Sequence, residues 1–489
     1  MENLIISTKK KFTMDKFFLQ AKVNASDDIE KVLNVTAKTI FASAETSNGV
    51  LSVSGKSVVS VLYLNADGAI CSADSVAEFI QKQKFDEQIT DIMVEDRTKV
   101  ESVNYSGNEV ICSILLEPEV QGQYKYNIPS FEENDNIVCE KENLKYKKLI
   151  CAPEDTFTVA EEFDISESGV QILAENSNVA LDEISCTVDK VVAEGKVIAE
   201  IIAKTEKDVF VINREFEFKQ EIAAEGVIPS MLSACRLELK NVSFVPEVKD
   251  DKNIIISNFE IGAKCFVYEE CEGDAITDIF SLEKDLDVVY DYIEADSFVK
   301  TITNSDTVLS QTNIAEIDGF DDIIGVYNPK SKVLSVEELG DKYVITSQIS
   351  AFALYKDSNG VSKLDICYET KYEILKEEDG SLSGVVSYAK INSFKVKAGK
   401  ELEVVFLVNY NAEFSKTISA KYVKNYEEKA QKTVSDYGVR VYITKKGQTL
   451  FEVAKILNVK PEIIEAQNII DDSFENGQKI YIYSPINLA

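Results

Sequence analysis

Apolar and polar residues alternate over three similar stretches of the chain, and each alternation stops at a polar turn. The stretches are LSVSGKSVVSVLYLNADG (51–68), VVAEGKVIAEIIAKTEKD (191–208) and VITSQISAFALYKDSNG (344–360). Alternation with a period of two that ends at a turn predicts a half-buried strand entering a hairpin. Because the same pattern returns twice, the chain is predicted to contain an internal repeat.

A second pattern, a strand followed by a tight turn and another strand, comes later in each copy. It occupies residues 100–116, 241–261 and 391–409. Together the two patterns predict a mostly β fold with three tandem all-β repeat domains, each an antiparallel sandwich or an open barrel. The expected domains are 1–155, 156–300 and 301–424, and the charged segment 425–438 is interpreted as a linker or a short helix.

Residues 439–489 have a different pattern, which predicts a small βααβ module. Val439, Val441 and Ile443 alternate with polar or aromatic residues and predict a strand. Thr449 followed by Glu452 is a capping box, and the helix after it has one apolar face, made by Leu450, Val453, Ala454 and Leu457.

The second half of the module contains similar signals, which predict a second helix and a last strand. Pro461 suits the first turn of a second helix, whose buried side is expected to contain Ile463, Ile464 and Ala466. Gly477 and Gln478 form a turn into a last strand, where Ile480 and Ile482 share one face.

The segment YITKKGQTLFEVAKILNVKPEIIEAQNIIDDSFENGQKIYIY (442–483) resembles a LysM domain over its full length. The shared features include G-x-T-L, the asparagine that closes the second helix, and G-Q-K-I before the last strand. In that family the groove for glycans containing N-acetylglucosamine lies between the loop after the first strand and the loop after the second helix. The resemblance implies that ligand- or partner-binding residues are Gly447, Gln448, Thr449, Leu450, Asn468, Ile469 and Ile470.

One position in this segment departs from the LysM pattern. The residue after the glycine is commonly Asp in the family and is Gln448 here. Ile469 and Ile470, followed by Asp471 and Asp472, offer apolar contact with an acidic rim to a protein partner. The alternative is that both isoleucines pack beneath the helices.

Three acidic β-repeats followed by one LysM domain resemble the proteins with DUF3794 domains, among them the SipL-type spore coat morphogenetic proteins. The resemblance implies an adaptor in the mother cell of a sporulating bacterium, which tethers the basal ATPase layer of the spore coat to the forespore surface. It implies no catalysis and no cofactor.

Composition excludes several other classes of function. The chain has 52 basic and 84 acidic residues, a net charge of -32, which disfavours binding to nucleic acid or to an anionic membrane. It contains no histidine, so catalytic triads with histidine and His-metal sites are excluded. Neither a P-loop nor a dinucleotide-binding glycine motif is present. Nine scattered cysteines without a C-x-x-C pair indicate reduced thiols rather than a metal site or a disulfide framework.

The chain is expected to be cytoplasmic, since residues 1–24 lack the apolar run of a signal peptide and no stretch reaches 18 apolar residues. Two functions stay open: a scaffold whose LysM domain binds a protein, and a protein whose LysM domain binds peptidoglycan or a chitin-type glycan. An enzyme is the least favoured class. The repeats are expected to hold a partner, or each other, through sheet edges and acidic patches.

Overall fold

The computed structural model is almost entirely β-structure, as predicted. It describes residues 3–86, 88–95, 98–132, 134–358, 360–377, 380–397, 401–432, 438–470 and 474–483. Within these residues there are 24 strands and two short helices, and all strand pairings are antiparallel. None of the helices described is long and apolar enough to cross a membrane.

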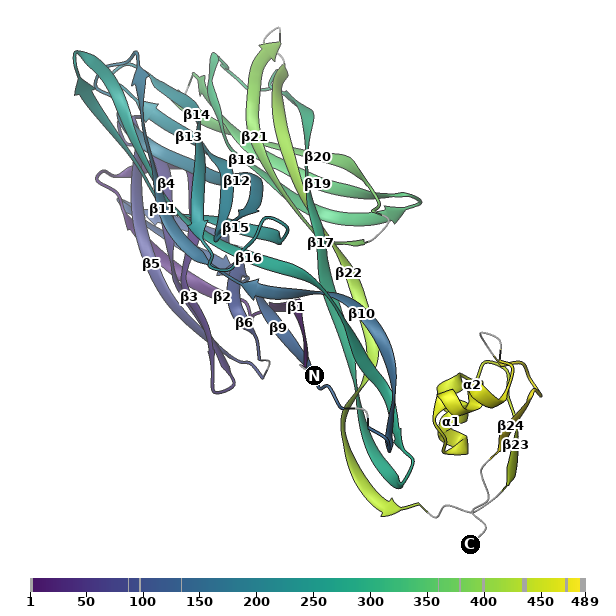
Figure 1. Ribbon diagram of the computed structural model, residues 1–489. Coiled ribbons are helices and arrows are strands. Elements are labelled where there is room, and N and C mark those ends of the chain that lie inside the picture. The colour runs from purple at the N-terminus through teal and green to yellow at the C-terminus, as the bar shows by residue number, and fades with distance from the viewer. Residues whose placement is uncertain are drawn as a thin grey trace.

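Three segments share one order of strands (Figure 1). Each opens with a long strand or strand pair and continues as a three-stranded meander. Each ends with a hairpin whose last strand returns beside the opening strand, and in the first repeat both strands of this hairpin are divided in two (β6 to β9). The first repeat contains β1 (Leu4–Thr13), β2 (Phe17–Asn24), β3 (Ile29–Ser47), β4 (Val50–Asn65), β5 (Ile70–Lys84), β6 (Thr90–Glu95), β7 (Thr98–Ser106), β8 (Glu109–Leu116) and β9 (Glu119–Ile128).

The second and third repeats use fewer, longer strands for the same path. The second contains β10 (Ile137–Cys151), β11 (Glu154–Ile165), β12 (Gln171–Thr187), β13 (Lys190–Lys204), β14 (Val209–Ala223), β15 (Leu232–Lys249) and β16 (Lys252–Ser281). The third contains β17 (Lys284–Asn313), β18 (Asp322–Leu339), β19 (Lys342–Asp357), β20 (Gly360–Leu375), β21 (Ser381–Lys397) and β22 (Glu401–Gln431).

The two patterns found in the sequence mark equivalent strands in the three repeats. The alternating stretches are β4, β13 and β19, each the middle strand of its meander and each paired with the next strand in a hairpin. The later pattern is the hairpin of the two returning strands, β7 with β8, β15 with β16, and β21 with β22. Both predictions are confirmed.

The expected domain boundaries at 155/156 and 300/301 fall inside strands β11 and β17. In each repeat the opening strand pairs with the last strand, as β11 does with β16 and β17 with β22. The expected boundaries therefore divide these strands: the first two residues of β11 and the first 17 of β17 fall in the preceding expected domain.

The interpretation of 425–438 as a linker or a short helix is wrong for its first half. Strand β22 continues to Gln431, which pairs with Lys284 at the start of β17. Cross-strand ion pairs, such as Lys429 with Asp287 (2.7 Å), suit an exposed two-stranded ribbon, so the high charge is compatible with a strand. Residues 433–437 lie outside the described residues.

Each repeat has its own core between two facing sheets. In the first repeat, sheet β3-β4-β5 faces sheet β2-β8-β7, and the core between them includes the fully buried Tyr63 and Leu116. In the third repeat the corresponding core includes Phe406 and Phe414, both without exposed surface. The antiparallel sandwich is therefore the observed form of the repeat.

The three repeats also share a central core, to which the three meanders contribute. Leu62 of β4, Ile202 of β13 and Leu354 of β19 are buried there together. These residues occupy equivalent positions in the alternating stretches, so the repeats are arranged around a common centre.

Polar contacts close the ring of repeats. Lys204 Nζ donates to the Ile70 carbonyl oxygen (2.8 Å), which joins the second repeat to the first. The third repeat is joined to the second by the ion pair of Lys356 with Asp208 (3.2 Å), and the first to the third by a hydrogen bond from Lys31 to Ser362 (3.3 Å).

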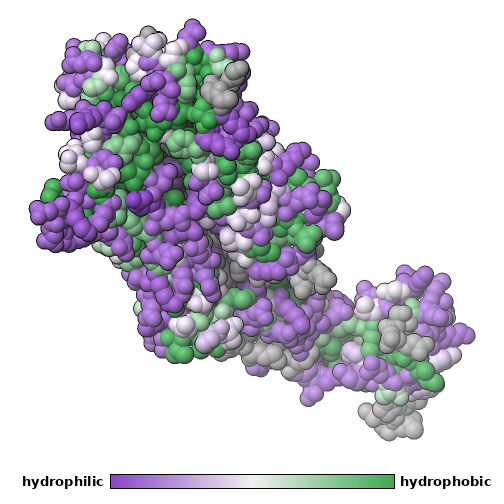
Figure 2. Space-filling model, turned by 90° about the horizontal axis from the view of Figure 1, so that it is seen from above, coloured by the Kyte–Doolittle hydropathy of each residue, from purple (hydrophilic) through white to green (hydrophobic). Residues whose placement is uncertain are grey.

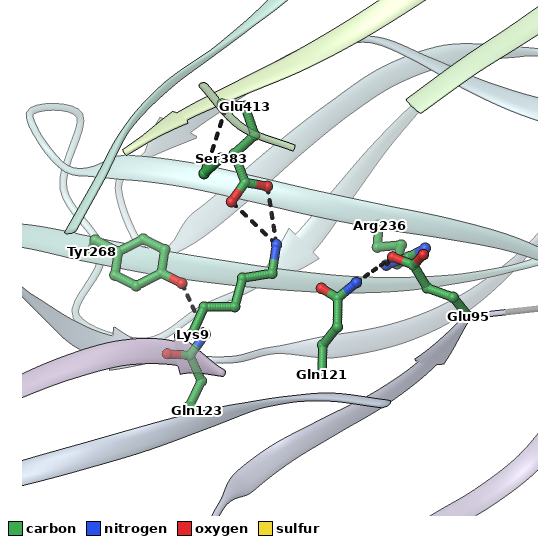
Figure 3. A network of polar contacts seen from close by, with 8 residues as sticks. All are labelled: Lys9, Glu95, Gln121, Gln123, Arg236, Tyr268, Ser383 and Glu413. Atoms are coloured by element: carbon green, nitrogen blue, oxygen red, sulfur yellow. Dashed lines mark hydrogen bonds and ion pairs between the residues drawn. The ribbon is translucent and has the colours of Figure 1, made fainter. Parts of the chain in front are cut away.

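A second shared region lies where the opening and last strands of the three repeats meet. Ile6 of β1, Tyr146 of β10 and Ile293 of β17 are buried in one apolar cluster. Beside it lies a polar network (Figure 3), in which Lys9 pairs with Glu413 (3.0 Å). In the same network Gln123 Nε2 donates to Tyr268 Oη (3.0 Å), Arg236 pairs with Glu95 (2.6 Å), and Gln121 donates to Glu95.

The repeats therefore hold each other in a different way from the one expected. Within the ranges that the structure describes, no strand of one repeat pairs with a strand of another. Shared apolar clusters and side-chain hydrogen bonds join them instead. That their sheet edges contact a further partner stays a prediction.

The end module (residues 439–483) lies beside the ends of the long strands of the second and third repeats (Figure 1). Its elements are β23 (Val439–Ile443), α1 (Leu450–Leu457), α2 (Pro461–Gln467) and β24 (Lys479–Tyr483). The predicted βααβ order is thus confirmed. In the space-filling view the module projects from the body, and most of the visible surface of the body is hydrophilic (Figure 2).

Candidate functional site

The local signals of the sequence account for the helices of the end module. Thr449 and Glu452 form the predicted capping box, and Pro461 occupies the first turn of α2. The core contains Phe451, Val453, Ala454, Leu457, Ile464, Ile480 and Ile482. The prediction for α2 is correct only for Ile464, because Ile463 and Ala466 are exposed on the seven-residue helix.

The first group of predicted site residues, Gly447 to Leu450, forms the turn after β23 and the start of α1. Gly447 has φ +83°, a left-handed conformation that favours glycine. The Gln448 side chain is used inside the module, since its Oε1 accepts from the Lys445 backbone N–H (2.8 Å) and its Nε2 donates to Tyr442 Oη (3.0 Å). Leu450 is half-buried against the module core.

Asn468, from the second predicted group, binds the outer edge of β24. Its Nδ2 donates to the carbonyl oxygens of Ile464 (2.9 Å) and Tyr481 (2.8 Å), and its Oδ1 accepts from the Tyr481 backbone N–H (2.7 Å). Gln467 makes the corresponding pair of bonds with Tyr483. Both N–H groups and the oxygen of the Asn468 amide therefore have a partner within the module.

The two isoleucines that follow Asn468 have different environments. Ile469 is 94% exposed, whereas Ile470 is half-buried and packs against the module core. The view of the pair as one exposed contact surface is wrong for Ile470. The acidic rim expected at Asp471 and Asp472 lies outside the described residues.

The two predicted loops lie at the same end of the β23–β24 sheet. The Thr444 backbone N–H donates to the Gln478 carbonyl oxygen (3.0 Å), and Gln478 Nε2 donates to the Ile469 carbonyl oxygen (3.4 Å). Among the residues described, no hydrogen bond joins 447–450 to 468–470 directly. Thr444 and Gln478 therefore connect the two halves of the candidate site.

A contact that sequence analysis did not identify holds α1 against the second repeat. The ring of Phe451 meets Phe280 of β16 edge to face, with centroids 5.2 Å apart. Lys455 pairs with Asp278 (2.6 Å), and Asn458 Nδ2 donates to the Leu282 carbonyl oxygen (2.8 Å). A hollow of about 330 Å³ remains beside this contact.

Asp278 is the polar centre of this contact. Burial opposes its ionisation, but hydrogen bonds from Lys455, the Tyr290 hydroxyl (2.6 Å) and the Ile279 backbone N–H (2.8 Å) give its carboxyl a net lowered pKa. Asp278 is therefore ionised at neutral pH and serves as the acceptor for three donors.

We expect Asp278→Asn to weaken the docking of the module on the repeats by about 1.5–3 kcal/mol, because three donors lose a charged acceptor. Small-angle X-ray scattering should show a larger radius of gyration for this variant than for the natural chain. Asp135→Asn is the matched control, because Asp135 pairs with Lys460 at a fully exposed position. An unchanged radius for Asp278→Asn would show that this ion pair does not hold the module.

Comparison with known proteins identifies one part of the chain. Residues 170–247 match the family model described as SipL, SPOCS domain, and they cover β12, β13, β14 and most of β15. No curated protein and no solved structure matches the chain. The match does not include the end module, so its assignment to the LysM family stays a prediction that rests on its motifs. The match to the SPOCS domain supports a SipL-type protein with a role in sporulation.

Proposed function

We propose that the chain is a non-enzymatic scaffold of a sporulating cell, in which the end module binds a protein partner at the forespore surface. The resemblance of the chain to SipL-type proteins implies that the partner belongs to the class of spore coat morphogenetic ATPases. The three repeats form the body that carries this module. The proposal rests on the SPOCS match in the second repeat and on the chemistry of the predicted ligand edge.

The observation that carries the proposal is the contrast between polar and apolar residues at this edge. The amide groups of Gln448 and Asn468 are bound within the module, and the Thr449 hydroxyl accepts the capping bond from Glu452 (3.1 Å). Sugar hydroxyls need such groups to be free, and an almost fully exposed Ile469 offers an apolar contact instead. This edge therefore suits a protein better than a glycan.

The docking of the module supports the same function. Its contacts with the repeats come from α1 and the residues on either side of it: Phe451, Lys455, Asn458 and Lys460, together with Thr449, whose side chain hydrogen-bonds Glu140 of β10. Ile469 lies outside this contact, since 94% of its side chain remains exposed. The body can thus hold the module while Ile469 remains accessible to a partner.

We expect Ile469→Asp to weaken binding to the coat ATPase by at least about 2 kcal/mol, because a few central residues carry most of the energy of an interface. The variant should keep the circular dichroism spectrum of the natural chain, since the side chain makes no core contact. Binding is measured by isothermal titration calorimetry with the purified ATPase.

Two further variants separate binding from folding. Ile456→Asp changes another exposed isoleucine, on α1, and should leave the affinity unchanged. Ile470→Asp should instead unfold the module, because it places a charge against the core. Equal affinities of the natural chain and Ile469→Asp would contradict the proposed role of this edge.

A further inference from the structure

The sheet of the end module has two edges, and the register of its strands defines which backbone groups face outward. Thr444 bonds to Gln478 next to the paired residues Ile443 and Lys479. Because bonded and non-bonded pairs alternate in an antiparallel ladder, the pairs of Tyr442 with Ile480 and of Arg440 with Ile482 are bonded. The N–H and C=O groups of Val439, Val441 and Ile443 therefore point away from β24.

One of these edges is closed and the other is open. Side chains of Gln467 and Asn468 bind the outward backbone groups of Tyr481 and Tyr483 on β24. Across the ranges described, no hydrogen bond reaches the outward groups of Val439, Val441 or Ile443 on β23. An edge of this kind can accept one more strand.

The side chains next to the open edge form an apolar surface. Val439, Val441 and Ile443 are 54%, 53% and 60% exposed. Tyr483 and Tyr481 stand opposite the two valines on β24, and both are partly exposed on the same face. Natural edge strands usually carry charges that prevent pairing, and β23 presents valine and isoleucine instead.

The charge of this sheet is opposite to that of the chain as a whole. Strands β23 and β24 and the turn 444–448 contain four basic residues, Arg440, Lys445, Lys446 and Lys479, and no acidic residue. The two exposed lysines Lys445 and Lys446 directly follow the open edge. In a chain of net charge -32, this local excess of positive charge selects an acidic ligand.

We propose that the open edge of β23 binds an extended polypeptide segment, which adds as an antiparallel third strand to the sheet of the end module. Apolar residues of the segment lie beside Val439, Val441 and Ile443, and acidic residues at its N-terminal end lie beside Lys445 and Lys446. This surface is on the sheet edge away from Asn468 and Ile469, so it does not depend on the function proposed above.

The test uses the full chain and a fluorescent peptide, Glu-Glu-Val-Thr-Val-Thr-Val, followed by fluorescence anisotropy. We expect saturable binding, and at least tenfold weaker binding of the peptide in which both glutamates are lysine. Val441→Pro should also weaken binding at least tenfold. Proline at this position removes only an outward N–H, so the ladder with β24 remains intact. Val441→Thr keeps this N–H and should bind as the natural chain does.

A second pair of probes leaves the protein unchanged and so does not depend on the folding of a variant. Peptides N-methylated at alternate amides should lose binding in one of the two alternation patterns and keep it in the other, because only one set of amides faces β23. Absence of saturable binding to the natural chain would overturn the proposal, as would equal binding of both methylated peptides. Dimers of the chain that Val441→Pro dissociates would instead assign the edge to a second copy and overturn the proposal too.

Discussion

At pH 8, Glu200→Gln should raise the free energy of unfolding by up to about 3 kcal/mol. Glu200 lies on β13 with 3% of its surface exposed, and its carboxylate accepts from Asn176 Nδ2 (3.2 Å) and from the Asn328 backbone N–H (3.0 Å). Burial outweighs these two hydrogen bonds and raises the pKa of Glu200 from 4.5 to about 7. Glutamine has the same shape and no charge, so the cost of burying the charge disappears.

The sign of the pH dependence follows from this raised pKa. Between about pH 4.5 and pH 7 the folded chain keeps a proton on Glu200 that the unfolded chain has released. The contribution of Glu200 to stability is therefore highest at low pH and is lost as the pH rises through this window. Chemical denaturation of both proteins at pH 5 and pH 8 measures the difference, which should be small at pH 5.

Glu217→Gln is the control for this experiment, because Glu217 lies on β14 with an exposed side chain. It should leave the pH dependence of unfolding unchanged. Parallel pH profiles for the natural chain and Glu200→Gln would contradict the assignment of a protonated Glu200 to the folded protein.

Leu354→Ala should lower the free energy of unfolding by about 2–5 kcal/mol, the range for a buried leucine that leaves a cavity. Leu354 has no exposed surface, and it lies in the central core with Leu62 of the first repeat and Ile202 of the second. Because three repeats share this core, the backbone amides of β4 and β13 should lose protection from hydrogen exchange together with those of β19. Hydrogen exchange followed by mass spectrometry measures this loss of protection.

The matched control is Leu375→Ala on β20, where 70% of the leucine is exposed. Its effect on stability should be small. If Leu354→Ala reduced protection in the third repeat alone, the repeats would be independent domains rather than one body.

Local patterns in the sequence predicted much of the fold. The alternation in β4, β13 and β19 identified the middle strand of each meander, because this strand has a neighbour on both sides and most of its buried side chains are apolar, with Ser57, Glu200 and Ser347 as exceptions. The opening strand β17 was missed because its exposed end carries charged residues, as at Lys284 and Asp287, which pair with residues of β22. Pairing with a strand more than 100 residues away leaves no local signal.

The candidate site was predictable only in part. Glycine and capping residues placed the turn at Gly447 and the start of α1, because these signals act within a few residues. Sequence could not distinguish Ile469 from Ile470, which differ in burial although they are neighbours. It also could not show that the apolar side of β23 faces outward. An alternating pattern defines two faces and does not indicate which of them meets the helices.

The contact of α1 with the second repeat had no sequence signal at all. Lys455 and Asp278 are 177 residues apart in the chain, and either one alone reads as an ordinary surface charge. Only the fold brings them together.

The proposed scaffold function is tested most directly by two calorimetric titrations of the full chain, one with the purified coat morphogenetic ATPase and one with chitin hexamer. We expect saturable binding of the ATPase, reduced at least about thirtyfold by Ile469→Asp, and no heat of binding with the glycan. Tight binding of chitin hexamer together with no binding of the ATPase would contradict the scaffold function and would assign the end module to a glycan ligand.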